Sequence, residues 1–384
     1  MSSVIFDVPP ISPAHDRALA RIEELRRTLR HYVAEPTRWV GQIRRVLAAQ
    51  AIRASNAIEG FHVSVEDAIA AIQGDEPTEA TEEDWHANED YRRAMTYVLQ
   101  LARDQRFTYS SQLIGSLHFM IAEHSPRAHP GLWRGGPVWV RDDITGEVVY
   151  EAPDAQDVPA LVEELVAQLR TDADIPVLIR AAMAHLNLAM IHPFRDGNGR
   201  MARCLQTVVL ARDRILEPTF ASIEEYLGRN TQSYYEILAQ VGRGRWHPPG
   251  DPEPWVRYCL RAHYIQAASV LRRVRESERI WSALDELRQR HRLPERTITA
   301  LFDATIGLRV RNSSYRLTLA GQSEGISNQV ATGDLRAMVA AGLLDQLGAK
   351  RGTYYRAAEP LRQILAEARA DRTPIDASSL FAAH

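Results

Sequence analysis

The feature that most constrains this chain is an apolar segment followed directly by a glycine-rich turn. Residues 176–191 (PVLIRAAMAHLNLAMI) are hydrophobic around nearly the whole circumference of a helix, which predicts a helix buried at the centre of the fold. Pro193 ends this helix, and Gly197 and Gly199 permit backbone angles that other residues avoid. Residues 200–212 then return to helical spacing. The segment therefore predicts two helices joined by a tight turn.

The turn itself, residues 192–203 (HPFRDGNGRMAR), has the composition of a phosphate site. Backbone N–H groups of a Gly-Asn-Gly sequence at a helix N-terminus form a concave anion site, and the helix dipole adds positive potential. Arg200 and Arg203 lie one turn apart and can each grip a phosphate with two hydrogen bonds. Asp196 supplies a hard oxygen ligand for Mg2+. The predicted ligand is a polyphosphate with its metal ion.

Composition describes an ordinary folded protein of two or three domains. Of the 384 residues, 45% are hydrophobic and 25% are charged, and the formal net charge is -3. Such a balance excludes a domain-wide basic field, so any contact with nucleic acid must come from a local patch. Lys350 is the only lysine, and its surroundings fit neither a Walker A loop nor a pyridoxal Schiff base.

The two cysteines, Cys204 and Cys259, cannot form a zinc motif of four cysteines or a disulfide framework. The N-terminus lacks a basic stretch followed by an apolar run, and no window approaches 18 uninterrupted apolar residues. We therefore expect a cytoplasmic protein that neither enters nor crosses a membrane.

Apolar residues recur at helical spacing along most of the chain, which predicts a mostly all-α protein. The clearest helical segments are residues 18–33, 40–55, 87–102, 111–124, 158–169 and 255–290. Residues 137–151 are the exception, because two short β-prone runs flank Asp142-Asp143-Ile144-Thr145-Gly146. A single hairpin among helices is interpreted as a flap.

The pattern His-x-Phe-x-Asp/Glu-Gly-Asn-Gly-Arg-x-x-Arg is complete in residues 192–203, and on it the chain resembles the Fic (Fido) family. The resemblance extends to Gly131-Leu-Trp-Arg134, to Tyr234-Tyr235 and to Ser55-Asn-Ala-Ile-Glu-Gly60. It covers roughly residues 30–260, as judged by the placement of these motifs. It implies the family's helical core with a β-hairpin flap.

The resemblance implies transfer of AMP from ATP to a Ser, Thr or Tyr hydroxyl of a target protein, which can be the chain itself. His192 would be the general base, and Asp196 would hold Mg2+. The implied phosphate-binding residues are Gly197, Asn198, Gly199, Arg200 and Arg203. Relatives with lysine at the position of Gly199 transfer the terminal phosphate, so glycine favours AMP transfer. Transfer of another nucleotide moiety is the alternative reaction.

Ser55-Asn-Ala-Ile-Glu-Gly60 resembles the family's inhibitory pattern, Ser/Thr-x-x-x-Glu-Gly/Asn. The resemblance implies that Glu59 pairs with Arg203 and keeps that guanidinium from the γ-phosphate. In some relatives the same glutamate positions water for removal of AMP, so a reverse reaction is also implied. The alternative is that Glu59 is a solvated surface residue.

Two further pairs of residues carry roles implied by the resemblance. Tyr234 and Tyr235 would line an adenosine pocket, although they could equally be core aromatics. Val140 and Arg141 would lie at the flap edge, which pairs with the main chain of the target by strand addition. Packing alone is the alternative for the flap.

Residues 293–370 resemble a winged helix-turn-helix domain, with Ser327 as an N-cap, Gly342 as a helix stop and a basic wing tip. DNA would contact Asn328, Gln329, Thr332, Arg336, Lys350 and Arg351. The alternative is a dimerisation or protein-docking unit, and a homodimer is left open. The runner-up function for the whole chain is a nucleotide-sensing transcriptional regulator.

The predicted divisions of the chain follow these motifs. They are residues 1–105 for an N-terminal helical region with the inhibitory motif, 106–260 for the catalytic core, 261–292 for connecting helices, 293–370 for the winged-helix-like domain and 371–384 for a tail.

Overall fold

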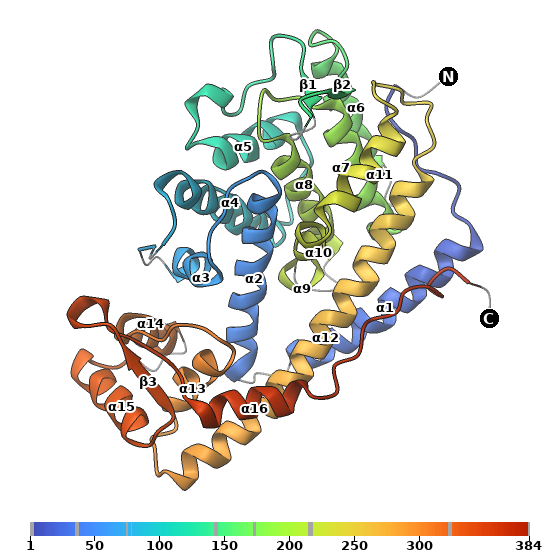
Figure 1. The fold of residues 1–384 in the computed structure, drawn as a ribbon. Coiled ribbons are helices and arrows are strands. Elements are labelled where there is room, and N and C mark those ends of the chain that lie inside the picture. The colour runs from blue at the N-terminus through green and yellow to red at the C-terminus, as the bar shows by residue number, and fades with distance from the viewer. Residues whose placement is uncertain are drawn as a thin grey trace.

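In the computed structural model, the described residues are 4–34, 38–73, 76–77, 79–141, 145–171, 174–213, 218–321 and 325–382. Within these ranges strands occur only in two small two-stranded sheets, which confirms the predicted mostly all-α fold (Figure 1). The elements in chain order are α1 (Pro13–Ala34), α2 (Arg38–Ile58), α3 (Val65–Gln73), α4 (Glu82–Leu101), α5 (Ser111–Ala122), η1 (Pro126–Ala128), β1 (Trp139–Arg141), β2 (Val148–Glu151), α6 (Val158–Thr171), α7 (Val177–Ile191), α8 (Asn198–Asp213), α9 (Pro218–Ala221), α10 (Glu224–Arg229), α11 (Thr231–Gly242), α12 (Glu253–Arg290), α13 (Thr297–Thr305), α14 (Asn312–Gly321), α15 (Asn328–Ala340), β3 (Leu344–Leu347), η2 (Lys350–Gly352), β4 (Tyr354–Ala357) and α16 (Glu359–Arg369).

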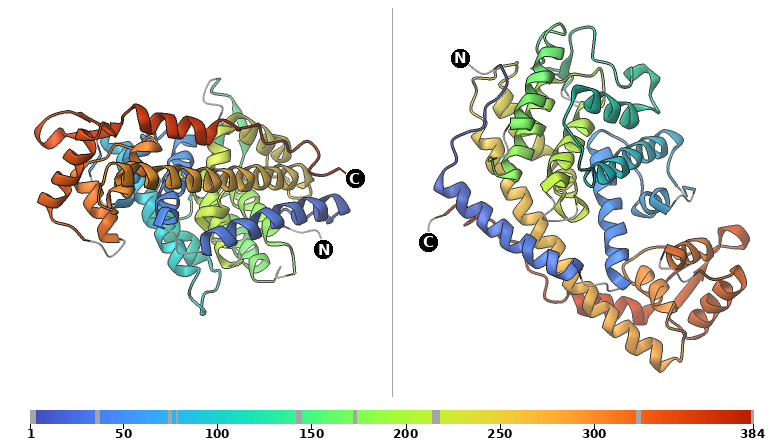
Figure 2. Two further views of the ribbon diagram at one scale, coloured as in Figure 1. Left: turned by 90° about the horizontal axis from the view of Figure 1, so that it is seen from below. Right: turned by 180° about the vertical axis from the view of Figure 1, so that it is seen from behind.

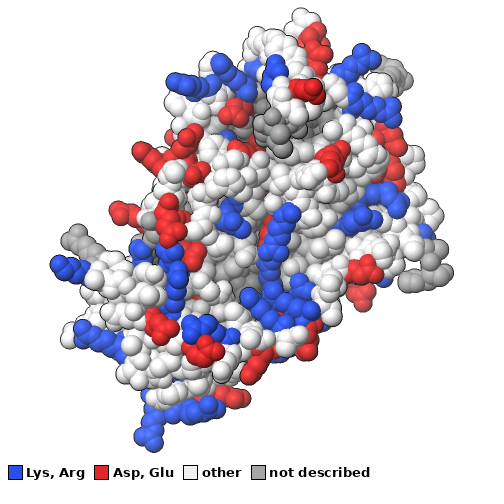
Figure 3. Space-filling model, viewed as in Figure 1, with Lys and Arg blue, Asp and Glu red and all other residues white. Residues whose placement is uncertain are grey.

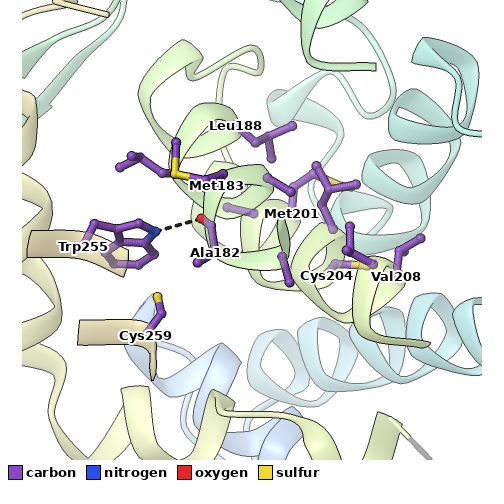
Figure 4. Close-up of a cluster of buried hydrophobic side chains, with 14 of the residues drawn as sticks. Ala182, Met183, Leu188, Met201, Cys204, Val208, Trp255 and Cys259 are labelled. Atoms are coloured by element: carbon purple, nitrogen blue, oxygen red, sulfur yellow. Dashed lines mark hydrogen bonds between the residues drawn. The ribbon is translucent and has the colours of Figure 1, made fainter. Parts of the chain in front are cut away.

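The centre of the fold is the packed pair of α7 and α8. Nearly every side chain of α7 is buried, as the all-round apolar sequence predicts. Leu188 of α7 and Met201 of α8 belong to the same hydrophobic cluster, which α12 closes with Trp255 (Figure 4). The Trp255 Nε1–H group donates to the Ala182 carbonyl at 2.7 Å, so this large side chain is buried without an unpaired donor. Helix α12 thus closes the core around the helix pair that flanks the glycine-rich turn.

Helix α12 is the longest element, with 38 residues. At 1.5 Å per residue it extends about 57 Å and runs along much of the molecule, with α1 beside it (Figures 1 and 2). Its first turns bury Trp255 in the cluster around α7, and its later turns bury Val270 and Leu284 among the C-terminal helices. The predicted boundary between residues 260 and 261 therefore falls inside one unbroken helix.

Helix α2 also takes part in two hydrophobic clusters. Ile52 and Ile58, in its C-terminal half, pack in the cluster around α7 and α8. Trp39, Ile43 and Leu47, in its N-terminal half, pack with side chains of the C-terminal helices. Figure 1 shows α2 running between these two parts of the molecule. The helix that carries Ser55 and leads into Glu59 is therefore anchored at both ends.

The predicted flap is a two-stranded antiparallel sheet of β1 and β2 in which Val140 lies opposite Tyr150. The register shifts after Val140, so the hairpin is irregular at Arg141. On its other side, Glu151 bonds through its backbone to Gly244 and Trp246. Residues 142–144 of the predicted turn lie outside the described residues.

The C-terminal unit, residues 293–370, begins with α13 and continues through α14, α15, the β3–β4 hairpin and α16. Val310, between α13 and α14, pairs with Tyr355 of β4. The Ser327 side chain accepts the Val330 N–H at the start of α15, and Gly342 has a φ of 69° after its end. These are the predicted N-cap and helix stop.

Two surface properties bear on where the protein could act. Among the described residues, no helix combines the length and the apolar character that crossing a bilayer requires. Both basic and acidic side chains are spread over the face in Figure 3, and a run of Lys and Arg side chains lies near its centre.

Candidate active site

The glycine-rich turn has the predicted form of helix, tight turn and helix. Helix α7 ends at Ile191, and its C-cap His192 has a φ of 52° and a ψ of 56°, in the left-handed region. Gly197 also has a positive φ, 75°, directly before α8 begins at Asn198. The chain therefore reverses within a few residues, and the N-terminus of α8 opens beside His192.

The His192 imidazole is half-buried and has a defined tautomer. Its Nδ1 lies 3.1 Å from the Ala189 carbonyl oxygen, which can only accept, so Nδ1 carries the proton. Nε2 is then the nitrogen with a free electron pair. Burial lowers the pKa of His192, and the Arg134 cation lowers it further, against the opposing effects of Glu59 and Asp196. The imidazole is therefore neutral near pH 7.

Arg134 holds the backbone of this turn, a role that its sequence motif did not reveal. Its Nε–H donates to the His192 carbonyl at 2.8 Å, and its backbone N–H donates to the Pro193 carbonyl at 2.9 Å. Nη1 bonds to Gly136 and Nη2 to Pro153, again at backbone carbonyls. Because no local sequence pattern marks an arginine that binds only carbonyls, this function could be found only in three dimensions.

Asn198 bonds to the turn itself through both ends of its side-chain amide. Its Oδ1 accepts the Phe194 N–H at 2.9 Å, and its Nδ2 donates to the Phe194 carbonyl at 2.9 Å. The residue is almost fully buried. The phosphate contact predicted for this side chain stays a prediction, and in this structure the amide braces the turn.

Asp196 is exposed on the same turn. Its Oδ1 accepts the N–H of Gly197 at 2.6 Å. Among the residues that the structure describes, no three His, Cys, Asp or Glu side chains lie close enough together to hold a metal ion. A single exposed carboxylate still fits Mg2+, which commonly takes one or two carboxylates together with substrate phosphates and water.

The two arginines of the motif are buried, with about 1% of each exposed. The Arg200 guanidinium lies 4.8 Å from the centre of the Phe61 ring, and its Nη1 makes a long hydrogen bond of 3.4 Å to the Ile121 carbonyl. Its Nε is buried and has no hydrogen-bond partner among the described residues. A buried guanidinium with an unsatisfied donor is suited to bind an anion. Phe61 was not singled out in the sequence.

Arg203 is held by the segment that resembles the inhibitory pattern. Its Nε donates to the Ser55 hydroxyl at 2.7 Å, and its Nη2 contacts both the Ser55 carbonyl at 2.9 Å and Glu59 Oε1 at 2.7 Å. Burial by itself lowers the pKa of Arg203, but the Glu59 carboxylate raises it above the usual value. Ser55 and Glu59 are thus in hydrogen-bond contact with Arg203, the residue that the resemblance to the family indicated.

Gly199 leaves the space that this ion pair occupies. A Cβ atom at residue 199 would overlap Glu59 Oε1 and come within 3.2 Å of Arg203 Nη1. Any larger residue at this position would displace the Glu59 carboxylate or the guanidinium.

The two tyrosines differ in their surroundings. Tyr234 is buried, and its hydroxyl bonds to His185 Nε2 at 2.9 Å, while burial raises its pKa to about 12. Tyr235 is 42% exposed, and its hydroxyl donates to the Ile58 carbonyl at 3.2 Å. Tyr234 is thus a core aromatic here, and Tyr235 lies at the surface beside the segment that resembles the inhibitory pattern. Their contact with adenosine stays a prediction.

The residues predicted to contact the target lie on β1. Val140 is half-buried against the main hydrophobic cluster, whereas Arg141 is exposed and donates to the Gly146 carbonyl at 2.9 Å. Trp139, Val148 and Val149 of the same hairpin expose large hydrophobic side chains.

The predicted DNA-contacting residues lie on α15 and the adjoining hairpin. Asn328, Gln329, Arg336 and Lys350 are exposed. Thr332 instead accepts from Asn312 at 2.9 Å and donates to the Asn328 carbonyl at 2.8 Å. The side chain of Arg351 lies outside the described part of the chain.

Residues 108–210, which contain the turn and the helices around it, match the model of the Fic/DOC family. This segment is similar to Fic/DOC domains. The chain is 28% identical over 162 residues to a probable protein adenylyltransferase of Aquifex aeolicus, covering 40% of this chain and 48% of that protein. It is 26% identical over 177 residues to the protein adenylyltransferase Fic of Nematostella vectensis, covering 44% of this chain and 35% of that protein. The chain therefore spans less than half the length of these relatives.

The arrangement of helices outside residues 108–210 also has a counterpart. The crystal structure of a Fic family protein from Desulfovibrio desulfuricans covers 92% of this chain and 98% of its own, with a TM-score of 0.57 and 21% sequence identity. At this identity the match establishes a common fold over nearly the whole chain.

Proposed function

We propose that this protein transfers AMP from ATP to a hydroxyl group of a protein, the activity that names the relatives of its Fic/DOC domain. One observation carries the proposal. A neutral imidazole with a free Nε2 lies at the start of the turn that leads into α8, and the first turns of α8 carry two buried guanidinium groups, each with a donor that has no hydrogen-bond partner among the described residues. A base beside an anion site is the arrangement that nucleotidyl transfer requires.

In the proposed reaction, the phosphates of ATP lie at the N-terminus of α8. The N–H groups of Gly197 and Gly199 and the guanidinium groups of Arg200 and Arg203 hold them. The target hydroxyl donates its proton to Nε2 of His192 as its oxygen forms a bond to the α-phosphorus. The bond from that phosphorus to the oxygen bridging to the β-phosphate breaks, and pyrophosphate leaves with the electron pair.

Mg2+ would neutralise the charge that develops on the phosphate oxygens. Asp196 is the residue placed to hold it, because its carboxylate is exposed at the end of the turn. Asn198 and Arg134 act on the backbone, since their hydrogen bonds to Phe194 and His192 fix the position of the turn.

We also propose that the enzyme rests in an inhibited state. Glu59 and Ser55 occupy donors of Arg203 that the γ-phosphate would need. The pair is held in place because α2 is anchored in two hydrophobic clusters. ATP that binds without Arg203 would have its α-phosphate misaligned for attack. In the reverse reaction, the same carboxylate would activate water to remove AMP.

Labelling with radioactive ATP at saturating ATP and Mg2+ tests this function. Glu59→Gly should increase self-labelling from α-labelled ATP at least about tenfold over wild type, which corresponds to roughly 1.4 kcal/mol of barrier. Adding His192→Ala should return labelling to background. Equal labelling of wild type and Glu59→Gly would contradict the inhibition. Label that survives His192→Ala would exclude His192 as the base, and label from the γ-position instead of the α-position would exclude AMP transfer.

A second candidate function is regulation of transcription through residues 293–370. The favouring observation is the exposed face of α15, which presents Asn328, Gln329 and Arg336, while its one acidic residue, Asp334, is buried in an ion pair with Arg296. Such a face suits the edges of bases in a major groove. If the full-length protein shows no salt-dependent affinity for any genomic duplex, this candidate fails.

A further inference from the structure

A buried histidine lies under the catalytic turn. His118, on α5, is fully buried, and both of its ring nitrogens have partners. The Gly131 N–H lies 3.0 Å from Nδ1, and Nε2 lies 2.9 Å from the Asp196 carbonyl oxygen. The N–H can only donate and the carbonyl can only accept. Nδ1 must therefore accept and Nε2 must carry the proton, which assigns one neutral tautomer.

One face of the same ring is also in contact with the turn. The His118 imidazole stacks on Phe194 with 3.5 Å between ring centres and 7° between planes, and Trp133 lies 5.0 Å from Phe194. A Cβ at Gly197 would lie 3.3 Å from His118 Nε2, so the turn closes directly on the ring. One side chain thus contacts the beginning, the middle and the end of the stretch between His192 and α8.

We propose that His118 is a positioning residue for the catalytic turn. Its Nε2–H holds the Asp196 carbonyl, and its ring supports Phe194, so the backbone that carries the base His192 and the metal-binding Asp196 is held in one conformation. The neutral tautomer that these two partners require accepts from the Gly131 N–H while it donates to the Asp196 carbonyl. The inference deepens the proposed function, since it names the residue that keeps this site in order.

Three substitutions separate the contacts. His118→Phe keeps a flat ring against Phe194 but removes both hydrogen bonds. His118→Gln can return a donor near the position of Nε2, and His118→Asn can return an acceptor near the position of Nδ1. If the bond to Asp196 is the one that matters, glutamine should restore the turn, whereas asparagine and phenylalanine should not. His291→Phe, at an exposed position after α12, is the matched control.

Amide hydrogen exchange of the full-length protein tests the proposal without requiring any enzymatic activity. The peptide that covers residues 193–199 should exchange at least about tenfold faster in His118→Phe and His118→Asn than in wild type, His118→Gln or His291→Phe, while α12 peptides keep their protection. Unchanged exchange in His118→Phe, or faster exchange throughout the protein in all three variants, would overturn the positioning role.

The second measurement uses the Glu59→Gly background. His118→Phe should lower kcat for transfer from α-labelled ATP about tenfold and leave KM for ATP within about threefold. The reason is that a displaced base stabilises the transition state less, while the binding of ATP in the ground state changes little. His118→Gln should recover most of kcat. A rise in KM alone would contradict the proposal. If the Glu59→Gly parent transfers nothing, the proposed function fails, and the exchange result still decides the role of His118.

Discussion

The ion pair between Glu59 and Arg203 makes a quantitative prediction about stability. Glu59→Ala removes a charge-assisted hydrogen bond of 2.7 Å from a guanidinium that is buried, whereas the carboxylate itself is 23% exposed. Hydrogen bonds to charged groups contribute about 1.5–3 kcal/mol, and Arg203 keeps its bonds to Ser55, so we expect a loss of about 2 kcal/mol. An entropy of unfolding of about 2.1 cal/mol/K per residue over 384 residues converts this loss into a decrease in Tm of roughly 2–3 °C.

The same variant should respond more strongly to anions. In wild type a phosphate group must displace Glu59 before it reaches Arg203, so pyrophosphate should bind wild type about 30-fold more weakly than the variant, the factor that 2 kcal/mol represents. At a concentration 100 times the Kd of the variant, pyrophosphate should stabilise the variant by about 2.7 kcal/mol and wild type by about 0.9 kcal/mol. The corresponding increases in Tm are about 3 °C and 1 °C.

Differential scanning calorimetry with and without pyrophosphate measures both effects. Glu163→Ala, at an exposed position of α6, is the matched control and should behave as wild type. If Glu59→Ala has the same Tm and the same response to pyrophosphate as wild type, Glu59 does not restrain Arg203, and the inhibitory role loses its physical basis.

Three further predictions follow from the buried groups near the site. Burial raises the pKa of Glu224 to about 7 from 4.5, so its contribution to stability is complete below pH 4.5 and is lost as the pH rises through 7. Wild type should lose about 1 kcal/mol more stability than Glu224→Gln between pH 6 and pH 8 in urea unfolding, and parallel pH profiles would refute this. Tyr234→Phe should cost about 1–2 kcal/mol in the same assay because His185 Nε2 is left without its donor, and an unchanged urea midpoint would count against that bond. Gly199→Ala should push the Glu59 carboxylate aside while it keeps the backbone N–H, so the response to pyrophosphate should approach that of Glu59→Ala, and a wild-type response would mean that the pair tolerates a methyl group.

The sequence predicted the local features of the fold well. Local sequence determines three of these features, namely the buried helix of residues 176–191, the N-cap at Ser327 and the helix stop at Gly342. The structure has a buried helix, a cap and a positive φ at these positions. Short elements such as α3 and α10 were not predicted, because their few residues carry little periodicity and their position depends on packing against α2.

The long-range contacts of the site were predicted less well than these local features. The contact between Glu59 and Arg203 spans 144 residues, and only the resemblance to a family motif indicated it. His118 and Arg134 act on backbone carbonyls, so no complementary charge or spacing in the sequence identifies their partners. The roles of such residues can be recognised only from the hydrogen bonds that their side chains make in the folded structure.

Helix α2 determines how this chain can be divided. Its N-terminal half completes the hydrophobic cluster of residues 293–370, so a fragment that ends at residue 292 would expose Trp39 and Leu47 to water. The register of α2 matters as much as its presence. Because an α-helix turns about 100° per residue, one residue inserted after Leu47 would leave Trp39 in place and rotate Ser55 away from Arg203. The number of residues between Trp39 and Ser55 therefore determines whether Ser55 can reach Arg203.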